Sequence, residues 1–445
     1  MLHGKRNRVL MIVENGPFVR DPRVRKEAMT LQSAGYKVSI ICPAPSPKAP
    51  WHEHIDGIAV YMFRPTTAGL RIWEYFLEYA YATLAICILS VVVLMREGFD
   101  VIHVANPPDT LVLIAAPYKL IGKRIIYDQH DLCPELFEAK FARIKWLVPL
   151  LLALERWSYR LADHVIVTNE SYGNQALTRG RISDSKITIV RNGPDLNAIR
   201  SASCDSELRN KSENIIAYTG TIGFQDGLDY LCRVLHYLRY QLARNDFCCV
   251  IIGDGDALSH VKALVQELHL VDNVCFTGWI DDCSRYLRYL NTADICVSPD
   301  PPTTYSNQST FIKIMDYMSA GKPIVAFDLA ETRYSAQDSC LYPVAEDEQQ
   351  FALCLAELMN KPDMRRTLGA IGQKRIREQL AWQYSVPHLL NAYSTCLGER
   401  TAELRTAELE LNREIGQQRQ LAGERIAVVP APADSSELAP NQRAS

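Results

Sequence analysis

Short apolar runs separated by helix-forming stretches follow one another along residues 8–398, and they predict strands alternating with helices. Because each strand is followed by a helical pattern, the alternation predicts parallel sheets with right-handed crossover connections. A first series of predicted strands occupies residues 8–13, 37–42, 57–63, 100–104, 124–127, 163–168 and 187–190. A second series occupies residues 215–218, 248–252, 274–277, 293–298 and 323–327. The fold class is therefore α/β, with two doubly wound sheets.

A polar stretch without apolar periodicity, residues 197–213, separates the two series. The chain of 445 residues is also too long for one hydrophobic core. We expect one domain over residues 1–200 and a second over residues 201–398, with the amphipathic stretch 382–396 packing back on the first. Residues 399–445 form a separate tail, first helical with abundant charge pairs and then rich in Pro, Ala and Ser, which predicts disorder.

One apolar stretch, residues 79–95, bears on the relation of the chain to membranes. It is slightly short for a spanning helix of about 20 residues, and a predicted strand follows it at once, so a helix buried or lying on a membrane surface is favoured over a span. The net charge of −3 argues against nucleic acid as a partner, and thirteen scattered cysteines without a C-x-x-C pair indicate a reducing compartment. We expect a cytoplasmic protein, with peripheral attachment to the inner face of the cell membrane left open.

The stretch from residue 305 to residue 328 carries the densest candidate chemistry. Ser309 is expected to cap a helix whose apolar stripe is Phe311, Ile314, Met315 and Met318 and which Gly321 ends. The amide groups at such a helix start suit a phosphate, and Lys313 adds a cation. Asp316, one turn further, suits the paired hydroxyls of a ribose. A surface ion pair on an ordinary amphipathic helix is the alternative.

Loops that follow predicted strands of the first domain supply a second set of candidates. Gly16 follows the first strand, where backbone can approach a ligand closely, although a lone glycine is a weak signal. Beside it, Arg23 and Arg25 either contact an anion or form a solvated helix face. Asn106 follows the strand at 100–104 and is a candidate on the acceptor or anion side.

His130 follows the strand at 124–127 and stands among Asp128, Asp131 and Glu135. An imidazole kept protonated by neighbouring carboxylates can donate a hydrogen bond to a sugar hydroxyl or a phosphate. The alternative is a loop histidine held by one of these carboxylates.

A glycine-rich loop, residues 219–229, follows the first strand of the second domain. Gly220, together with Gly223 and Gly227, allows backbone N–H groups to approach an anion, and Gln225 and Asp226 lie in the same loop. No D-x-D pair stands where it would hold a divalent ion, since residues 254–256 are interpreted as a turn, so we expect no metal.

These motifs resemble the retaining glycosyltransferases of family 4, which have the two-domain GT-B fold. The resemblance covers about residues 8–398 and is specific because several ordered motifs carry it. They are ENGPFVRDPRVRKEA at 14–28, YDQHDLCPE at 127–135, VRNGPD at 190–195, YTGTIGFQDGLD at 218–229 and STFIKIMDYMSAGKPIVAFD from 309. It implies two Rossmann-like domains that face each other across a cleft, the C-terminal one holding most of a nucleotide-diphospho-sugar.

The resemblance also assigns roles. Gly16 would meet the donor phosphates, His130 would sit by the transferred sugar, and Asp316 would hold the ribose as the second acid of the family's E-x7-E motif. The first acid of that motif falls at Gln308, which leaves the sugar open, and Ser309 and Thr310 follow it. Where many relatives place an arginine and a lysine on the diphosphate, this chain has Thr221 and Asp226. Lys313 is then the candidate for the missing cation.

The implied reaction moves a sugar from a nucleotide-diphospho-sugar to a hydroxyl of a glycan or a lipid-linked intermediate, with retention and without a metal or other cofactor. The pattern is similar to a subgroup found in bacterial polysaccharide assembly. Expected partners are the donor, the acceptor and, as an open alternative, a membrane surface, but not nucleic acid. A nucleotide-sugar 2-epimerase on the same fold and a non-catalytic membrane scaffold remain alternatives. A dehydrogenase is disfavoured because the dinucleotide fingerprint is incomplete.

Overall fold

The computed structural model describes residues 7–65, 72–141, 144–195, 203–344 and 346–398. The described residues up to Leu397 form one compact unit. The predictions for the tail at 399–445 lie outside the described residues, as does part of the predicted linker. The division of the chain at residue 200 stays a prediction, although the strands do fall into two separate sheets.

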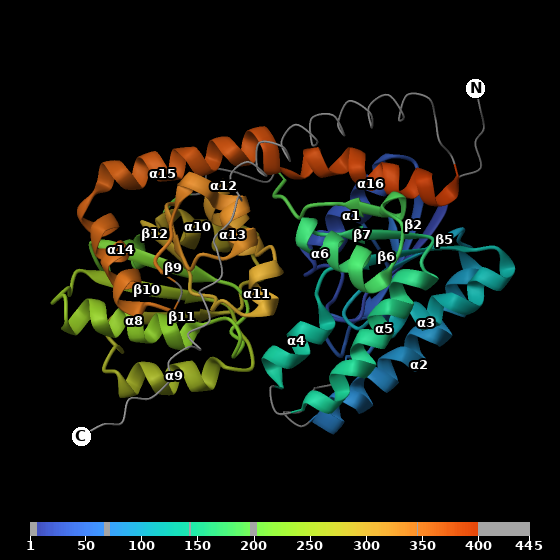
Figure 1. Ribbon diagram of the computed structural model, residues 1–445, viewed down its shortest axis with the longest axis horizontal. Helices are drawn as coiled ribbons and strands as arrows, with labels where there is room; N and C mark the ends of the chain where they lie inside the picture. Colours follow the sequence, from blue (N-terminus) through green and yellow to red (C-terminus); the bar gives the residue numbers. More distant parts are fainter. Residues whose placement is uncertain (1–6, 66–71, 142–143, 196–202, 345, 399–445) are drawn as a thin grey trace, which may run out of the picture. The chain divides into compact units, whose positions relative to one another are not determined.

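The first sheet has eight strands in the order β3-β4-β2-β1-β5-β6-β7-β8 (Figure 1). The strands are β1 (Arg8–Ile12), β2 (Lys37–Pro43), β3 (His52–Ile55), β4 (Ile58–Phe63), β5 (Val101–Ala105), β6 (Arg124–Gln129), β7 (His164–Val167) and β8 (Ile187–Ile189). All neighbours pair in parallel except β3 and β4. The seven predicted strands are confirmed, and β3 is an addition that the apolar pattern missed because its sequence is H-E-H-I.

Helices cover both faces of this sheet, and alternate residues of β1 show which helices cover which face. Val9 and Met11 pack in one core with residues of α1 and α16, whereas Leu10 and Ile12 pack in the other with residues of α2, α3 and α5. Residues 7–195, which contain this sheet, are called the first half, and the described residues from 203 on are called the second half. The helices of the first half are α1 (Pro22–Ser33), α2 (Ile72–Arg96), α3 (Leu111–Ala115), α4 (Cys133–Lys140), α5 (Val148–Leu161) and α6 (Glu170–Gln175). Asp21 caps α1 through its side chain, and Pro22 occupies the first turn.

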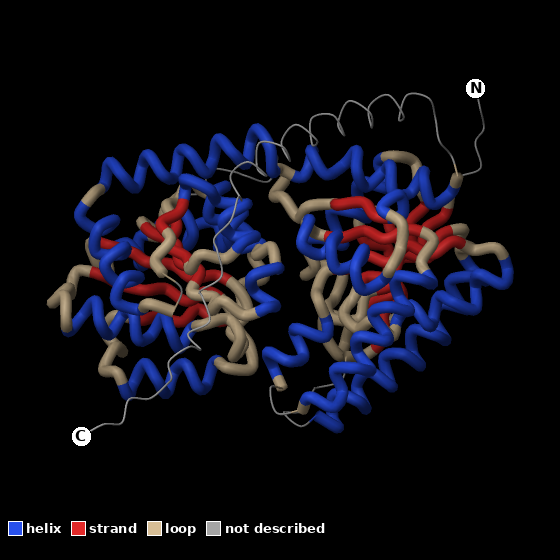
Figure 2. Tube along the Cα trace, in the orientation of Figure 1, coloured by secondary structure: helices blue, strands red, loops and turns tan. Residues whose placement is uncertain are grey.

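The second sheet has six parallel strands in the order β11-β10-β9-β12-β13-β14. The strands are β9 (Asn214–Thr219), β10 (Phe247–Ile252), β11 (Val274–Gly278), β12 (Ile295–Ser298), β13 (Ile324–Ala326) and β14 (Cys340–Leu341). Its helices are α7 (Ser206–Arg209), α8 (Leu228–Tyr240), α9 (Leu258–Glu267), α10 (Cys283–Thr292), α11 (Thr304–Gln308), α12 (Ile312–Ser319), α13 (Ala330–Ala336), α14 (Glu348–Asn360) and α15 (Pro362–Arg375). Figure 2 shows each group of strands enclosed by helices, the arrangement expected of a doubly wound sheet.

The last described helix, α16 (Trp382–Leu397), packs on the first sheet rather than on the second. Leu389 and Tyr393 are fully buried there. At the start of the helix, the Trp382 backbone N–H donates to the carbonyl oxygen of Pro194 (2.8 Å), and its indole Nε1 donates to Thr30 Oγ1 (3.0 Å). The stretch expected to pack back on the first domain shares a core with the first sheet.

Strand order reverses at one point in each sheet. β1 lies between β2 and β5, and β9 lies between β10 and β12. In open α/β sheets, ligands bind at the carboxyl ends of the strands beside such a reversal. The loops after β1, β5 and β6, and those after β9 and β12, therefore lie where a ligand is expected, and they carry most of the candidate residues.

Candidate active site

His130 stands one residue beyond the end of β6, and a carboxylate from that strand holds it. Its Nε2 lies 2.5 Å from Oδ2 of Asp128, whose side chain is fully buried. Burial alone would lower the pKa of His130, but the Asp128 carboxylate outweighs it and raises that pKa above its ordinary value. The raised pKa favours a protonated imidazole, and the Asp128 contact is also the one expected of a loop histidine held by a carboxylate.

The backbone around His130 is held by Asn106, in the loop after β5. Asn106 Oδ1 accepts hydrogen bonds from the backbone N–H groups of His130 (2.6 Å) and Asp131 (3.1 Å). Its Nδ2 donates to Asp109 Oδ1 and to the Tyr127 hydroxyl, and the residue is 1% exposed. The amide is thus fully engaged inside the protein, and its observed contacts hold the His130 loop in place.

Arg23 is engaged inside the protein as well. Its Nη2 lies 2.8 Å from Asp128 Oδ1 and 3.1 Å from Glu27 Oε1, and its Nη1 donates to the carbonyl oxygen of Val190. The guanidinium is 3% exposed, so the expected anion contact is replaced by an internal ion pair, and the solvated-face alternative is excluded for this residue. Arg25 is solvated: it pairs with the exposed Asp56 in the turn between β3 and β4.

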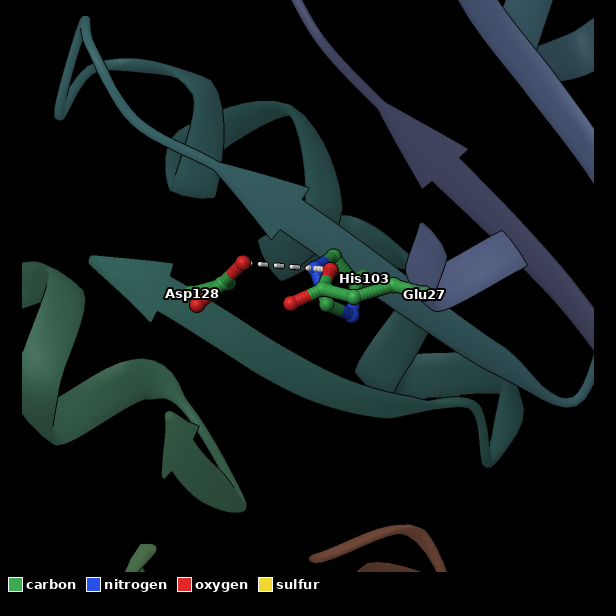
Figure 3. A group of neighbouring side chains, drawn as sticks. All are labelled: Glu27, His103 and Asp128. Atoms are coloured by element: carbon green, nitrogen blue, oxygen red, sulfur yellow. Dashed lines mark ion pairs between the residues drawn. The ribbon is translucent and has the colours of Figure 1, made fainter. Parts of the chain in front are cut away.

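Glu27, His103 and Asp128 complete a buried cluster beneath His130 (Figure 3). His103 Nε2 lies 3.4 Å from Asp128 Oδ2 and 3.5 Å from Glu27 Oε2, and its Nδ1 shares a 2.7 Å hydrogen bond with the Tyr393 hydroxyl of α16. Burial would raise the pKa of Asp128, but Arg23 and His130 outweigh it and hold that pKa well below its usual range. For Glu27, burial prevails over the attraction of Arg23 and raises the pKa to about 7.

Two carboxylates and an imidazole are also a possible ligand set for a metal ion, but the residues around them do not fit one. The Arg23 guanidinium lies against both carboxylates and supplies the positive charge that a cation would bring. A divalent ion placed there would be repelled by it at close range. The cluster is an internal ion-pair network that supports His130.

Gly16 lies in the loop between β1 and α1. A Cβ built on it would meet no atom within 4 Å. Folding therefore does not require a glycine at this position. Open space beside the backbone is what a close approach by a ligand needs.

The candidate cation of the second half, Lys313, lies in α12 and contacts residues at the ends of β12 and β9. Its Nζ lies 2.7 Å from Asp300 Oδ1 and 4.7 Å from the centre of the Tyr218 ring, and it is 8% exposed. Asp226 lies near the same charge: burial raises its pKa to about 6, an effect that Lys313 partly offsets. One lysine therefore faces two carboxylates, Asp300 and Asp226, at the carboxyl ends of β12 and β9.

The glycine-rich loop after β9 is shaped by close backbone contacts. Gly227 has φ of +70°, and a Cβ on it would lie 2.1 Å from the Pro299 carbonyl oxygen. Gly220 also has a positive φ, +139°. Among the described residues, the buried Oε1 of Gln225 has no hydrogen-bond partner, while Asp226 Oδ2 accepts from the Gly223 N–H (2.8 Å). An unpaired buried oxygen in this loop is an available acceptor for a ligand.

The predicted helix cap at Ser309 is wrong. A short helix, α11, ends at Gln308 with Ser309 as its C-terminal cap, and α12 begins at Ile312 after Phe311. Thr303 and Ser306 form a capping box that starts α11, so the chain makes two helices where the sequence suggested one. Gly321 does end α12, with φ of +67°.

Asp316 lies in α12, where its Oδ2 accepts a hydrogen bond from the Tyr286 hydroxyl (2.8 Å). Burial raises the pKa of Asp316 to about 6, and the Tyr286 hydrogen bond and Lys26 partly offset that effect. Asp316 stays the candidate for contact with the ribose hydroxyls.

Helix α6 and its N-terminal cap contact three of the candidates, Gln308, Ser309 and Thr310. Asn169 Nδ2 donates to the Gln308 carbonyl oxygen and to Thr310 Oγ1, both at 2.9 Å, and the Ser309 hydroxyl lies 3.0 Å from that of Tyr172. The Gln308 side chain accepts from Gln175 Nε2 at 2.6 Å. In this structure, these three candidates contact protein groups.

Sequence reasoning missed several residues that hold the candidates. Asp300 faces Lys313, Tyr286 bonds Asp316, and the Tyr305 hydroxyl donates to Asp131 Oδ1 (2.8 Å) beside His130. His103 offered a signal, because it interrupts the apolar strand Val101–Ala105. The partners of Lys313 and Asp316 gave none, since they are distant in sequence.

The known proteins that this chain is similar to are glycosyltransferases. A family model described as Glycosyltransferase Family 4 matches residues 23–198, and one described as Glycosyl transferases group 1 matches residues 213–361. An uncharacterized glycosyltransferase of Methanocaldococcus jannaschii is 20% identical over 371 residues, which are 78% of this chain and 87% of that protein.

Solved structures share the fold. Sucrose-phosphate synthase from Thermosynechococcus elongatus superposes with a TM-score of 0.73 at 18% identity, over 89% of this chain and 100% of the other. Anabaena HepE in complex with UDP-glucose gives a TM-score of 0.64 at 14% identity, over 87% and 99% of the two chains.

The two doubly wound sheets define a two-domain α/β enzyme of the GT-B fold. The chain belongs to the family 4 glycosyltransferases, and it is a glycosyltransferase. The predicted fold class, family and enzyme class are confirmed.

Proposed function

We propose that this glycosyltransferase moves a sugar from a nucleotide-diphospho-sugar to a hydroxyl of a glycan or lipid-linked acceptor, with retention of configuration and without a metal ion. The observation that carries the proposal is the set of groups at the strand-order reversal of the second sheet. There Lys313, the unpaired oxygen of Gln225 and the Asp316 carboxylate surround the carboxyl ends of β9 and β12.

In this proposal, the second half holds the donor. The Asp316 carboxylate accepts the ribose hydroxyls, and Lys313 with backbone N–H groups of residues 220–227 faces the diphosphate. Lys313 also bonds Asp300, so its charge is already positioned before the donor arrives. That HepE is solved with UDP-glucose supports a nucleotide-sugar donor on this fold.

His130 is proposed to donate a hydrogen bond to the transferred sugar or to the donor phosphate. The chemical step breaks the bond between the anomeric carbon and the phosphate oxygen and forms one between that carbon and the acceptor oxygen. The acceptor proton passes to the departing phosphate oxygen, so no protein base is required. Positive charge and amide groups stabilise the negative charge that develops on the leaving diphosphate. Residues at strand ends of both halves therefore serve one transfer.

The first experiment screens nucleotide sugars for thermal protection and for slow donor hydrolysis. A nucleotide-diphospho-sugar is expected to raise the unfolding temperature, and Asp316→Ala is expected to abolish most of that rise. The control is Asp338→Ala, which changes an exposed aspartate outside the candidate site. Unchanged donor binding in Asp316→Ala would contradict the proposed site.

The reaction is tested with the donor found in that screen. Proton NMR of the product is expected to show the donor's anomeric configuration, and an inverted product would refute retention. Activity is expected to be the same in EDTA as in Mg²⁺, because charge neutralisation is assigned to Lys313 and backbone amides. An epimerised sugar nucleotide formed without acceptor would favour the epimerase alternative. Full cellular function of Asp316→Ala would favour a non-catalytic scaffold.

A further inference from the structure

Helix α2 carries an apolar stripe that faces away from the protein. Leu77, Tyr81, Leu84, Ile88, Val91 and Met95 are all exposed, and their spacing alternates between four and three residues, so they line one side of the helix. Leu84 is 62% exposed and Met95 is 74% exposed. The part of α2 from Leu77 to Arg96 is the one helix among the described residues long and apolar enough to cross a membrane, judged by length and composition.

The opposite side of α2 belongs to the protein core. Ala82, Ile86 and Val93 are at most 2% exposed and pack in the same cluster as residues of the first sheet. The Ser90 hydroxyl, also buried, lies 2.8 Å from the hydroxyl of Tyr118. A helix anchored in this way cannot leave the sheet to span a bilayer without exposing that core. The helix therefore stays on the sheet, and its apolar outer side can only contact something outside the protein.

Neighbouring helices extend the apolar stripe. α3 contacts both α2 and α5, and all three cover the same face of the first sheet, as Figures 1 and 2 show. Directly after α3, Leu120 is 90% exposed, and around α5 Trp146 and Trp157 are 76% and 54% exposed. Of the 24 large exposed apolar residues described, twelve fall between residues 77 and 157. Such a concentration exceeds the scattered exposure normal for a protein surface.

Basic side chains lie beside most of this apolar surface, while the partly exposed Glu74 and Glu78 stand at its start on α2. Lys145, Arg156 and Arg160 are exposed around α5, whereas the acid of that helix, Glu155, is fully buried. Arg96 is exposed at the end of α2. Basic side chains next to exposed tryptophans and leucines match an anionic lipid surface, where tryptophan favours the headgroup level and apolar side chains enter the acyl boundary.

We propose that the face formed by α2, the segment 111–121 and the segment 145–161 docks on the surface of an anionic membrane, with α2 lying in the interface. Lysine and arginine side chains around α5 contact the lipid headgroups, and the α2 stripe inserts its apolar side chains. This docking is independent of the proposed donor and acceptor, because none of these residues belongs to the candidate active site.

The test is flotation of the full chain with lipid vesicles. Vesicles of phosphatidylcholine with about one third phosphatidylglycerol are expected to carry the protein, whereas phosphatidylcholine alone carries much less. Leu84→Glu and Ile88→Glu are each expected to reduce binding at least about tenfold, because they remove an inserted side chain and add repulsion. Arg156→Gln and Arg160→Gln are expected to reduce it about fivefold each.

Leu353→Glu is the matched control, since Leu353 is 51% exposed on α14, in the second half, and its substitution should leave vesicle binding unchanged. The unfolding temperature of each variant shows that it is folded. Wild type that stays unbound with anionic vesicles overturns the proposal. So does a wild-type dimer that Leu84→Glu dissociates without any effect on vesicle binding, because the face would then pair two copies of the chain.

Discussion

At the scale of single residues, the chemistry of His130 depends on groups that fold around it. Asp128 supplies the negative charge, Arg23 holds Asp128, and Asn106 fixes the backbone of the loop. Arg23 and Asn106, two candidates for the acceptor or anion side, position the histidine through these contacts. Polar residues at these positions correctly marked the region of the candidate site. Because both side chains are buried, they bond to neighbouring protein groups.

Asp128→Asn removes the charge that raises the pKa of His130. The protonated imidazole is then lost at a lower pH, so the decline of activity on the alkaline side should move to lower pH, and kcat near neutrality should fall about 10- to 100-fold. Initial rates measured across pH test this. The control is Asp163→Asn. The native Asp163 pairs with Lys119 and Arg124 and not with His130, so this variant should keep the wild-type pH profile. An unmoved alkaline limb in Asp128→Asn would contradict the assignment.

Asp316 gives a second pH dependence at the residue scale. Because burial raises its pKa to about 6, the carboxylate form is lost as pH falls through that value, and with it the acceptor for ribose hydroxyls. Affinity for a nucleoside diphosphate should therefore fall more steeply on acidification in the wild type than in Asp316→Asn. Isothermal titration calorimetry measures the affinity of both proteins across pH. Because the nucleotide titrates in the same way in both experiments, the difference between the two curves reports Asp316. Parallel curves would refute the role.

At the scale of elements, the loops at the strand ends differ in how strictly folding shapes them. The loop after β9 is packed against the loop after β12, since a Cβ on Gly227 would meet the Pro299 carbonyl oxygen. The loop after β1 leaves open space at Gly16. A glycine in the sequence is therefore compatible with two different physical reasons, one structural and one functional.

Alanine substitutions separate these two reasons. Gly227→Ala should destabilise the protein by more than about 2 kcal/mol, because the new methyl clashes and φ is positive. Gly16→Ala should change stability by less than about 1 kcal/mol yet weaken donor binding, since the methyl fills space left for the ligand. Urea denaturation and donor titration measure the two effects. Wild-type donor affinity in Gly16→Ala would remove that loop from the site.

The apolar periodicity located nearly every strand of both sheets and the stripe of α12, but it did not locate the start of that helix. Ser309 has the chemistry of an N-terminal cap, yet its hydroxyl donates to the Tyr305 carbonyl oxygen and closes α11. Local propensity permits both outcomes. Tertiary contact with Tyr172 and Asn169 accompanies the one observed.

At the scale of the whole molecule, α16 joins the end of the second half to the first sheet. Its Tyr393 hydroxyl bonds His103, which lies beside Asp128, so this helix also completes the cluster beneath His130. The C-terminal helix is thus part of the support for a residue far away in sequence.

Leu389→Ala on α16 should lower the free energy of unfolding by about 2–5 kcal/mol, because Leu389 is fully buried against the first sheet. Leu353→Ala, at a half-exposed position on α14, should cost less than about 1 kcal/mol. Urea denaturation provides both values. Equal small losses would show that α16 is not firmly packed.

The sequence by itself determined the number and order of the main strands, the return of the C-terminal helix and the loops that hold the candidate chemistry. Apolar spacing and turn residues act locally, and they are therefore legible without coordinates. Tertiary structure alone decided which polar side chains face a ligand and which face one another. Arg23 shows the reason: it meets Asp128, 105 residues away, only when α1 packs on the first sheet, and burial then makes that pairing obligatory.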